Sequence, residues 1–145
     1  MNGRRHGVFR SILVGYDGSV QAEKAAAVAF SLAEALDSRV LLFAVARPPE
    51  PATSVEVHAV LDDAKEHYQE GFNRILAQAR ERGILVESEI VVGHPAEQII
   101  HHAETRDVDL VILGRRGTSM FEKLILGSVS ERVLRYAHCP VMVIR

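Results

Sequence analysis

Residues 108–130 read VDLVILGRRGTSMFEKLILGSVS and combine three features in a fixed order. An apolar strand, Val108 to Leu113, leads into the glycine loop Gly114-Arg115-Arg116-Gly117, and nine residues later Gly127-Ser128-Val129-Ser130 opens a predicted helix. The first N–H groups of a helix have no intrahelical partner, and the helix dipole adds partial positive charge there. Glycines let the backbone approach a ligand closely, and arginines favour an anion such as phosphate. The segment therefore predicts an anion-binding site.

The glycine pattern differs from two common nucleotide-binding motifs. It lacks the glycine-lysine-serine/threonine ending of a P-loop and the closely spaced three-glycine fingerprint of dinucleotide-binding domains. The spacing Gly114-x2-Gly117-x9-Gly127-Ser128, placed after an apolar strand, resembles the ATP-binding signature of the universal stress protein family. This resemblance covers nearly the whole chain and is closest over residues 12–17 and 109–145.

Outside this segment, the chain alternates between apolar strands and amphipathic helices and has no hairpin signals. Such alternation predicts a parallel sheet with helices on both faces, an open doubly wound, Rossmann-like α/β fold. The 145 residues are expected to form a single domain, with residues 1–8 as a flexible tail. The expected strands are 9–16, 39–46, 85–92, 108–113 and 140–144, and the expected helices lie between Ser19 and Leu36, over 55–82, after Pro95 and over 129–136.

The composition of the strands predicts their order. The first and fourth strands are near-continuously apolar and belong in the middle of the sheet, whereas Glu87 and Glu89 place the third strand at an edge. The order 3-2-1-4-5 fits this pattern and puts the fifth strand at the other edge. A bare apolar edge favours pairing with a second copy, so we expect a homodimer through Val141, Met142, Val143 and Ile144.

In a sheet of this type, ligands bind beyond the carboxyl ends of the strands, where the winding direction reverses. Here that point lies between the first and fourth strands, where Gly15-Tyr16-Asp17 and the glycine loop leave the sheet. Val45, at the end of the second strand, adds an apolar wall. Two features found independently therefore converge on one crevice.

The family resemblance implies roles for individual residues of this crevice. Asp17 would meet the ribose or adenine, and Val45 would offer backbone groups to the base. Tyr16 departs from the family pattern, where smaller residues are common, and Arg116 varies within the family. The implied ligand is ATP, with Mg²⁺ or Mn²⁺ held mainly by the phosphates. Leu113, Gly114 and Arg116 would line the ribose and phosphate path, and Gly117, Gly127, Ser128, Val129 and Ser130 would surround the phosphates.

Several candidate residues have structural alternatives. The pair Ser128 and Glu131 matches a capping box, which would occupy the serine hydroxyl with a backbone N–H group. Asp17 could serve only as a turn residue. His101 and His102 are adjacent on a helix, point about 100° apart and do not suit a shared metal ion. We therefore expect no metal site built from protein side chains.

The net charge of the chain and the residue types missing from the glycine loop both limit the classes of function that fit this sequence. A net charge of −2 gives no electrostatic case for nucleic acid or an acidic membrane, and no apolar run approaches membrane-spanning length. With a single cysteine and no signal-peptide pattern, the chain is expected to be cytoplasmic. The loop has no aspartate, histidine or P-loop lysine, so no catalytic residues are expected and any ATP hydrolysis should be slow. The hypotheses are an ATP-binding stress regulator, a dimeric interaction module without nucleotide, and a slow ATPase.

Overall fold

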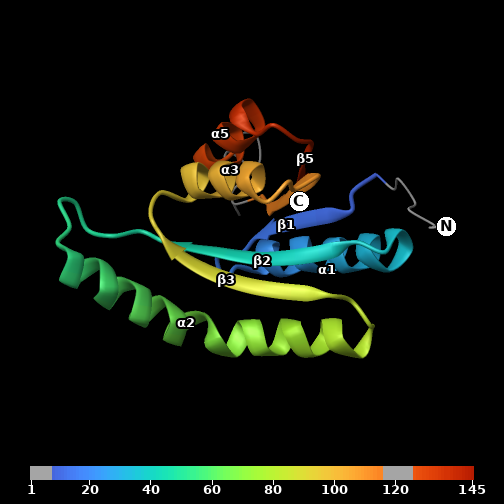
Figure 1. Ribbon diagram of the computed structural model, residues 1–145, viewed down its shortest axis with the longest axis horizontal. Helices are drawn as coiled ribbons and strands as arrows, with labels where there is room; N and C mark the ends of the chain where they lie inside the picture. The colour runs from blue at the N-terminus through green and yellow to red at the C-terminus, as the bar shows by residue number, and fades with distance from the viewer. Residues whose placement is uncertain (1–7, 116–125) are drawn as a thin grey trace.

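The computed structural model describes residues 8–115 and 126–145. Its five strands form one parallel sheet in the order β3-β2-β1-β4-β5, which confirms the predicted fold class and strand order (Figure 1). The expected tail residues 1–7 lie outside the described residues, and Val8 is exposed. In chain order the elements are β1 (Ser11–Gly15), α1 (Val20–Leu36), β2 (Arg39–Ala46), α2 (Ser54–Glu81), β3 (Val86–Val92), α3 (Pro95–Thr105), β4 (Leu110–Gly114), α5 (Ser128–Tyr136) and β5 (Val141–Ile144).

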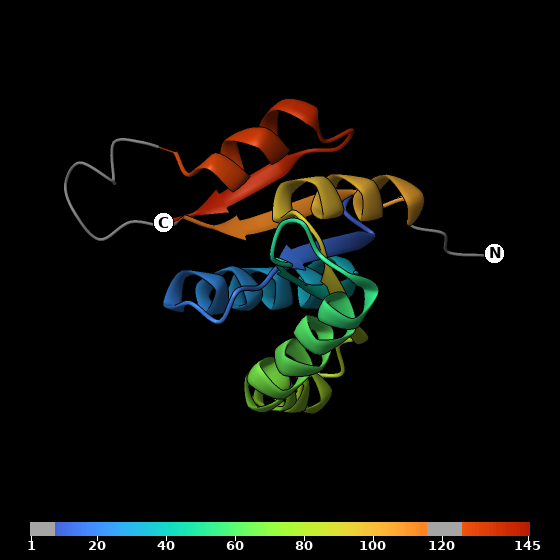
Figure 2. The same cartoon turned by 90° about the vertical axis from the view of Figure 1, so that its left-hand side faces the viewer.

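Helices cover both faces of the sheet. Helices α1 and α2 lie on one face and α3 and α5 on the other, as the two views show (Figures 1 and 2). Successive side chains of a strand point to opposite faces, so β1 contributes Ile12 and Val14 to one core and Leu13 to the other. Because α1 and α5 lie on opposite faces, the winding direction reverses between β1 and β4.

Helix α1 packs closely on the sheet because its buried stripe consists mainly of alanine. Ala25 and Ala29 are fully buried, and Phe30 is the one large side chain in the stripe. The helix begins where predicted, since the Ser19 side chain accepts a hydrogen bond from the Ala22 N–H at 3.1 Å. Small side chains let the backbone of the helix approach the strands closely.

The structure shortens the first expected strand and confirms the extent of the long helix. Strand β1 does not extend over 9–16, because Phe9 has a φ of 65°, which extended backbone excludes. In α2, the apolar face expected along 55–82 is the shielded face of the helix: Ala64, Phe72, Ile75 and Ala79 are buried, and Val57, Val60, Leu61, Tyr68 and Leu76 are half-buried. A helix of 28 residues is about 42 Å long, and the seven residues of β3 span about 23 Å. The first part of α2 therefore extends beyond the sheet (Figure 1).

Helix α3 carries a histidine whose surroundings disfavour protonation. The His102 ring packs on Phe43 of β2, with ring centroids 4.7 Å apart. Its buried Nδ1 has no hydrogen-bond partner among the described residues. Burial lowers the pKa of His102, and the nearby Glu89 carboxylate opposes this only in part.

This pKa shift predicts a pH dependence of stability. Since the pKa is lower in the folded than in the unfolded protein, the unfolded state binds more protons as the pH falls through about 6.5. The free energy of unfolding should therefore fall between pH 7.5 and pH 5.5, and His102→Leu should make that fall smaller. Urea unfolding at both pH values measures the effect, with the exposed His101→Leu as control. An equal fall in the His102→Leu protein would contradict this prediction.

No helix in the described part of the chain has the length and apolar character needed to cross a membrane.

Candidate nucleotide site

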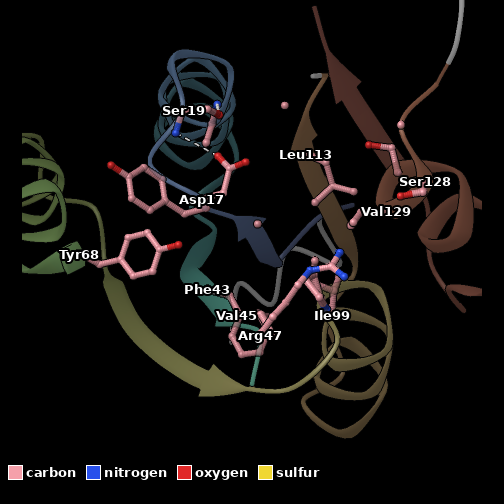
Figure 3. A pocket seen from close by; sticks show the side chains of 17 residues that line it. Asp17, Ser19, Phe43, Val45, Arg47, Tyr68, Ile99, Leu113, Ser128 and Val129 are labelled. Atoms are coloured by element: carbon pink, nitrogen blue, oxygen red, sulfur yellow. Dashed lines mark hydrogen bonds between the residues drawn. The ribbon is translucent and has the colours of Figure 1, made fainter. Parts of the chain in front are cut away.

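A cavity of about 230 Å³ lies at the carboxyl ends of β1, β2 and β4, where the winding direction reverses (Figure 3). Tyr16 and Asp17 follow β1, Val45 lies near the end of β2, and Leu113 and Gly114 end β4. The start of α5 forms the opposite wall. The lining comprises Gly15, Tyr16, Asp17, Ser19, Ala22, Phe43, Val45, Arg47, Tyr68, Pro95, Ile99, Leu113, Gly114, Gly127, Ser128, Val129 and Ser130.

The structure brings together every predicted site residue that it describes. Arg116 and Gly117 fall within 116–125 and so lie outside the described residues. The other candidates line the one cavity: Gly15, Tyr16, Asp17, Val45, Leu113, Gly114, Gly127, Ser128, Val129 and Ser130.

The start of α5 presents backbone N–H groups without a side-chain cap. Gly127 occupies the N-cap position and no side chain caps the helix, so the capping box between Ser128 and Glu131 does not form. Ser128 is instead the first residue of the helix. The bond from the Glu131 N–H to the Gly127 carbonyl, at 2.9 Å, begins the helical pattern. The N–H groups of the residues between, 128–130, therefore have no intrahelical acceptor and suit an anion.

Asp17 combines a turn role with a place in the cavity wall. Its Oδ1 accepts a hydrogen bond from the Ser19 N–H at 3.0 Å, the geometry of an Asx turn. The same residue lines the cavity opposite α5 (Figure 3). The turn therefore fixes where the carboxylate lies, and the two interpretations of Asp17 are compatible.

Two glycines of the motif differ in the space around them. A Cβ atom on Gly114 would lie 2.4 Å from the backbone carbon of Gln21 in α1, closer than packed atoms come. A Cβ atom on Gly127 would meet nothing within 4 Å, and its φ of −61° suits any residue. Gly114 is thus required by the packing of α1 on β4, whereas Gly127 leaves open space at the start of α5.

The large side chain of Tyr16 is accommodated by α2. The side chain is 5% exposed, packs on Tyr68 and Phe72, and donates a hydrogen bond to Glu23 at 3.3 Å. Burial raises the pKa of the Tyr16 hydroxyl, and the Glu23 carboxylate raises it further. A Cβ atom on Gly71, inside α2, would lie 2.6 Å from that hydroxyl oxygen. Gly71 therefore makes room for Tyr16.

This contact predicts that the effect of Gly71→Ala on stability changes sign when the Tyr16 hydroxyl is removed. Gly71→Ala should destabilise the protein by about 1–2 kcal/mol, because the strain of overpacking exceeds the gain in helix propensity. In a Tyr16→Phe protein, which lacks the hydroxyl, the same change should stabilise by about 0.5–1 kcal/mol. A double-mutant cycle by urea unfolding measures this coupling. Equal destabilisation in both backgrounds would show that Gly71 serves another purpose.

Sequence reasoning missed several lining residues, among them one that follows a strand and two that come from helices. Arg47 directly follows β2, so the rule that placed Val45 at this edge could have found it. Tyr68 and Ile99 come from the helices α2 and α3, and no local signal distinguishes them from other apolar helix positions. Their place in the wall depends on tertiary packing.

The described residues do not form a metal-binding cluster. Within 8–115 and 126–145, no group of three histidine, cysteine, aspartate or glutamate side chains is placed to hold an ion. Asp17 is the one carboxylate in the described lining of the cavity.

This architecture defines a class of protein: a doubly wound parallel α/β domain whose cavity lies at the switch point of the sheet. Residues 9–145 match the model of the Universal stress protein family, and the chain belongs to that family. Universal stress protein MJ0531 of Methanocaldococcus jannaschii is 32% identical over 95% of this chain and 83% of its own.

Solved structures agree with this fold. The structure of MJ0577, from the same archaeon, superposes with a TM-score of 0.78 at 26% identity, covering 94% of this chain and 96% of that chain. A universal stress protein in complex with cAMP superposes with a TM-score of 0.73 at 23% identity, covering 95% and 98% of the two chains.

Proposed function

We propose that this protein binds ATP in the switch-point cavity and acts as a nucleotide-dependent regulator in the stress response. The observation that carries the proposal is the start of α5, where the uncapped N–H groups of residues 128–130 adjoin the open space beside Gly127. Such a helix start binds phosphate through both hydrogen bonds and the helix dipole. Gly117 of the glycine loop and Arg116, a position that varies within the family, would complete the phosphate site.

The other side of the cavity suits a nucleoside. Phe43, Val45 and Ile99 supply apolar surface for a base, and Asp17 supplies a carboxylate that can accept hydrogen bonds from ribose hydroxyls. In this arrangement the base lies toward β2 and the phosphates lie toward α5. Leu113 and Gly114 line the path between them.

Family membership and a nucleotide-bound neighbour support this assignment. The solved complex with cAMP places an adenine nucleotide on a protein of the same fold. The chain retains the glycine spacing of the ATP-binding signature that it resembles. ATP, rather than a nucleotide with a single phosphate, is proposed because that spacing provides backbone donors along the chain after β4.

Binding rather than catalysis is proposed for this cavity. Phosphoryl transfer needs carboxylates that hold metal ions and a group that positions the attacking oxygen. In the described lining, Asp17 is the one carboxylate, and it lies across the cavity from α5 (Figure 3). Mg²⁺ or Mn²⁺ would therefore be held mainly by the phosphates, with hydrolysis slow.

Calorimetric titration tests the proposal directly. Purified protein titrated with MgATP should release heat that fits one site per chain, and mass spectrometry should detect ATP that stays bound through gel filtration. GTP serves as the control for the base. No heat and no thermal shift at millimolar ATP would remove the proposed function and leave an interaction module.

A second copy of the chain is the partner we propose. Strand β5 lies at the edge of the sheet, and its residues Val141, Met142, Val143 and Ile144 are only partly buried. Apolar edge strands pair readily with their own copy about a two-fold axis. Light scattering at micromolar concentration should give twice the mass of the chain, and a purely monomeric mass would contradict this assembly.

A further inference from the structure

Arg47 is a cavity residue to which the glycine motif assigns no role. It follows the last residue of β2 and lines the switch-point cavity. It also lines a second hollow of about 200 Å³ together with Pro95, Ser128 and Val129. In Figure 3 its side chain reaches from the end of β2 toward Ile99 and Val129. Arg47 therefore stands where the two hollows meet, beside the start of α5.

The charges around Arg47 leave its guanidinium available for an anion. The other basic side chains at the second hollow already have carboxylate neighbours, His94 with Glu50 at 2.8 Å and Arg132 with Glu97 at 3.3 Å. In the parts of the chain that the structure describes, no carboxylate pairs with Arg47. An arginine presents five N–H donors in a planar fork that matches phosphate oxygens.

We propose that Arg47 binds the phosphate chain of the ligand and selects nucleotides with two or more phosphates. The inference rests on the proposed function, because it takes the α5 start as the position of the first phosphates. A longer phosphate chain would continue from Ser128 and Val129 into the second hollow, past the guanidinium of Arg47. A nucleoside monophosphate ends before that hollow and gains less from Arg47.

The test compares two arginines of the same strand region. Arg47→Gln removes the charge at the carboxyl end of β2, and Arg39→Gln removes the same charge at its amino end, outside both hollows. Calorimetry with ATP, ADP and AMP should show that Arg47→Gln weakens ATP binding by about tenfold or more. AMP binding should change less than about threefold. Arg39→Gln should bind all three ligands as the unchanged protein does.

The outcomes separate this inference from the proposed function. If the unchanged protein binds ATP and Arg47→Gln binds it equally well, or loses ATP and AMP to the same extent, the role of Arg47 is wrong while nucleotide binding stands. If the unchanged protein binds none of the three nucleotides, the proposed function fails and the inference fails with it. Arg47→Lys should restore part of the preference for ATP, since a lysine keeps the charge but not the fork.

Discussion

Replacing Gly127 by valine should abolish ATP binding while the protein stays folded. The added side chain enters the open space beside the α5 start and blocks approach to the N–H groups of residues 128–130. Losing several hydrogen bonds to charged oxygens should raise the dissociation constant by at least about a hundredfold. The loss of ATP affinity is therefore expected to exceed that of Arg47→Gln, which removes a single side chain from the phosphate path.

The fold should tolerate this change. Valine is a poorer N-cap residue than glycine, by about 1 kcal/mol, but it also stiffens the unfolded chain, which returns about 0.4–1 kcal/mol. The melting temperature should then stay within about 3 °C of the unchanged protein. Calorimetry and thermal unfolding of the ligand-free protein measure the two effects separately. Normal ATP affinity in Gly127→Val would show that the phosphates do not bind at the α5 start.

Replacing Gly114 by alanine, in contrast to Gly127→Val, should act mainly on stability and destabilise the fold. The added Cβ atom would lie 2.4 and 2.5 Å from the carbonyl carbon and oxygen of Gln21 and 2.8 Å from the Ala22 nitrogen. All three are backbone atoms of α1, so no side chain can rotate away to relieve the overlap. We expect a loss of about 3 kcal/mol, at the upper end of overpacking effects, and a fall in melting temperature of about 10 °C.

Gly127→Ala provides the matched control for this measurement. The same substitution at the other glycine meets nothing within 4 Å and should change the unfolding midpoint in urea only slightly. Unchanged stability in Gly114→Ala would mean that α1 can move away from β4 at little cost. The two glycines of one motif are thus expected to serve different purposes, packing at Gly114 and access of the proposed ligand at Gly127.

The sheet and the position of its cavity follow from the sequence by simple rules. The first, second and fourth strands are short continuous apolar runs, which indicate central parallel strands, and Glu87 and Glu89 mark the edge. Once the order is known, the carboxyl ends of β1 and β4 must flank the switch point. The residues that follow those strands therefore lie together, as Asp17 and Gly114 do.

The contributions of α2 and α3 to the cavity were beyond sequence reasoning. Tyr68 lines the cavity wall because of where α2 packs in the fold. Gly71 is needed only because Tyr16 lies against it. Both facts depend on tertiary distances that no local pattern encodes.

The backbone of α1 at Gln21 lies directly against Gly114, so this contact sets the separation between the start of α1 and the end of β4 at the cavity. A cavity whose width is already set in the free protein is preorganised for its ligand, so little free energy is lost to rearrangement on binding. We therefore expect the start of α1 and the end of β4 to keep their separation when the proposed nucleotide binds. A downstream partner would instead have to contact the bound nucleotide itself, or respond to the change in surface charge that the nucleotide causes around the cavity.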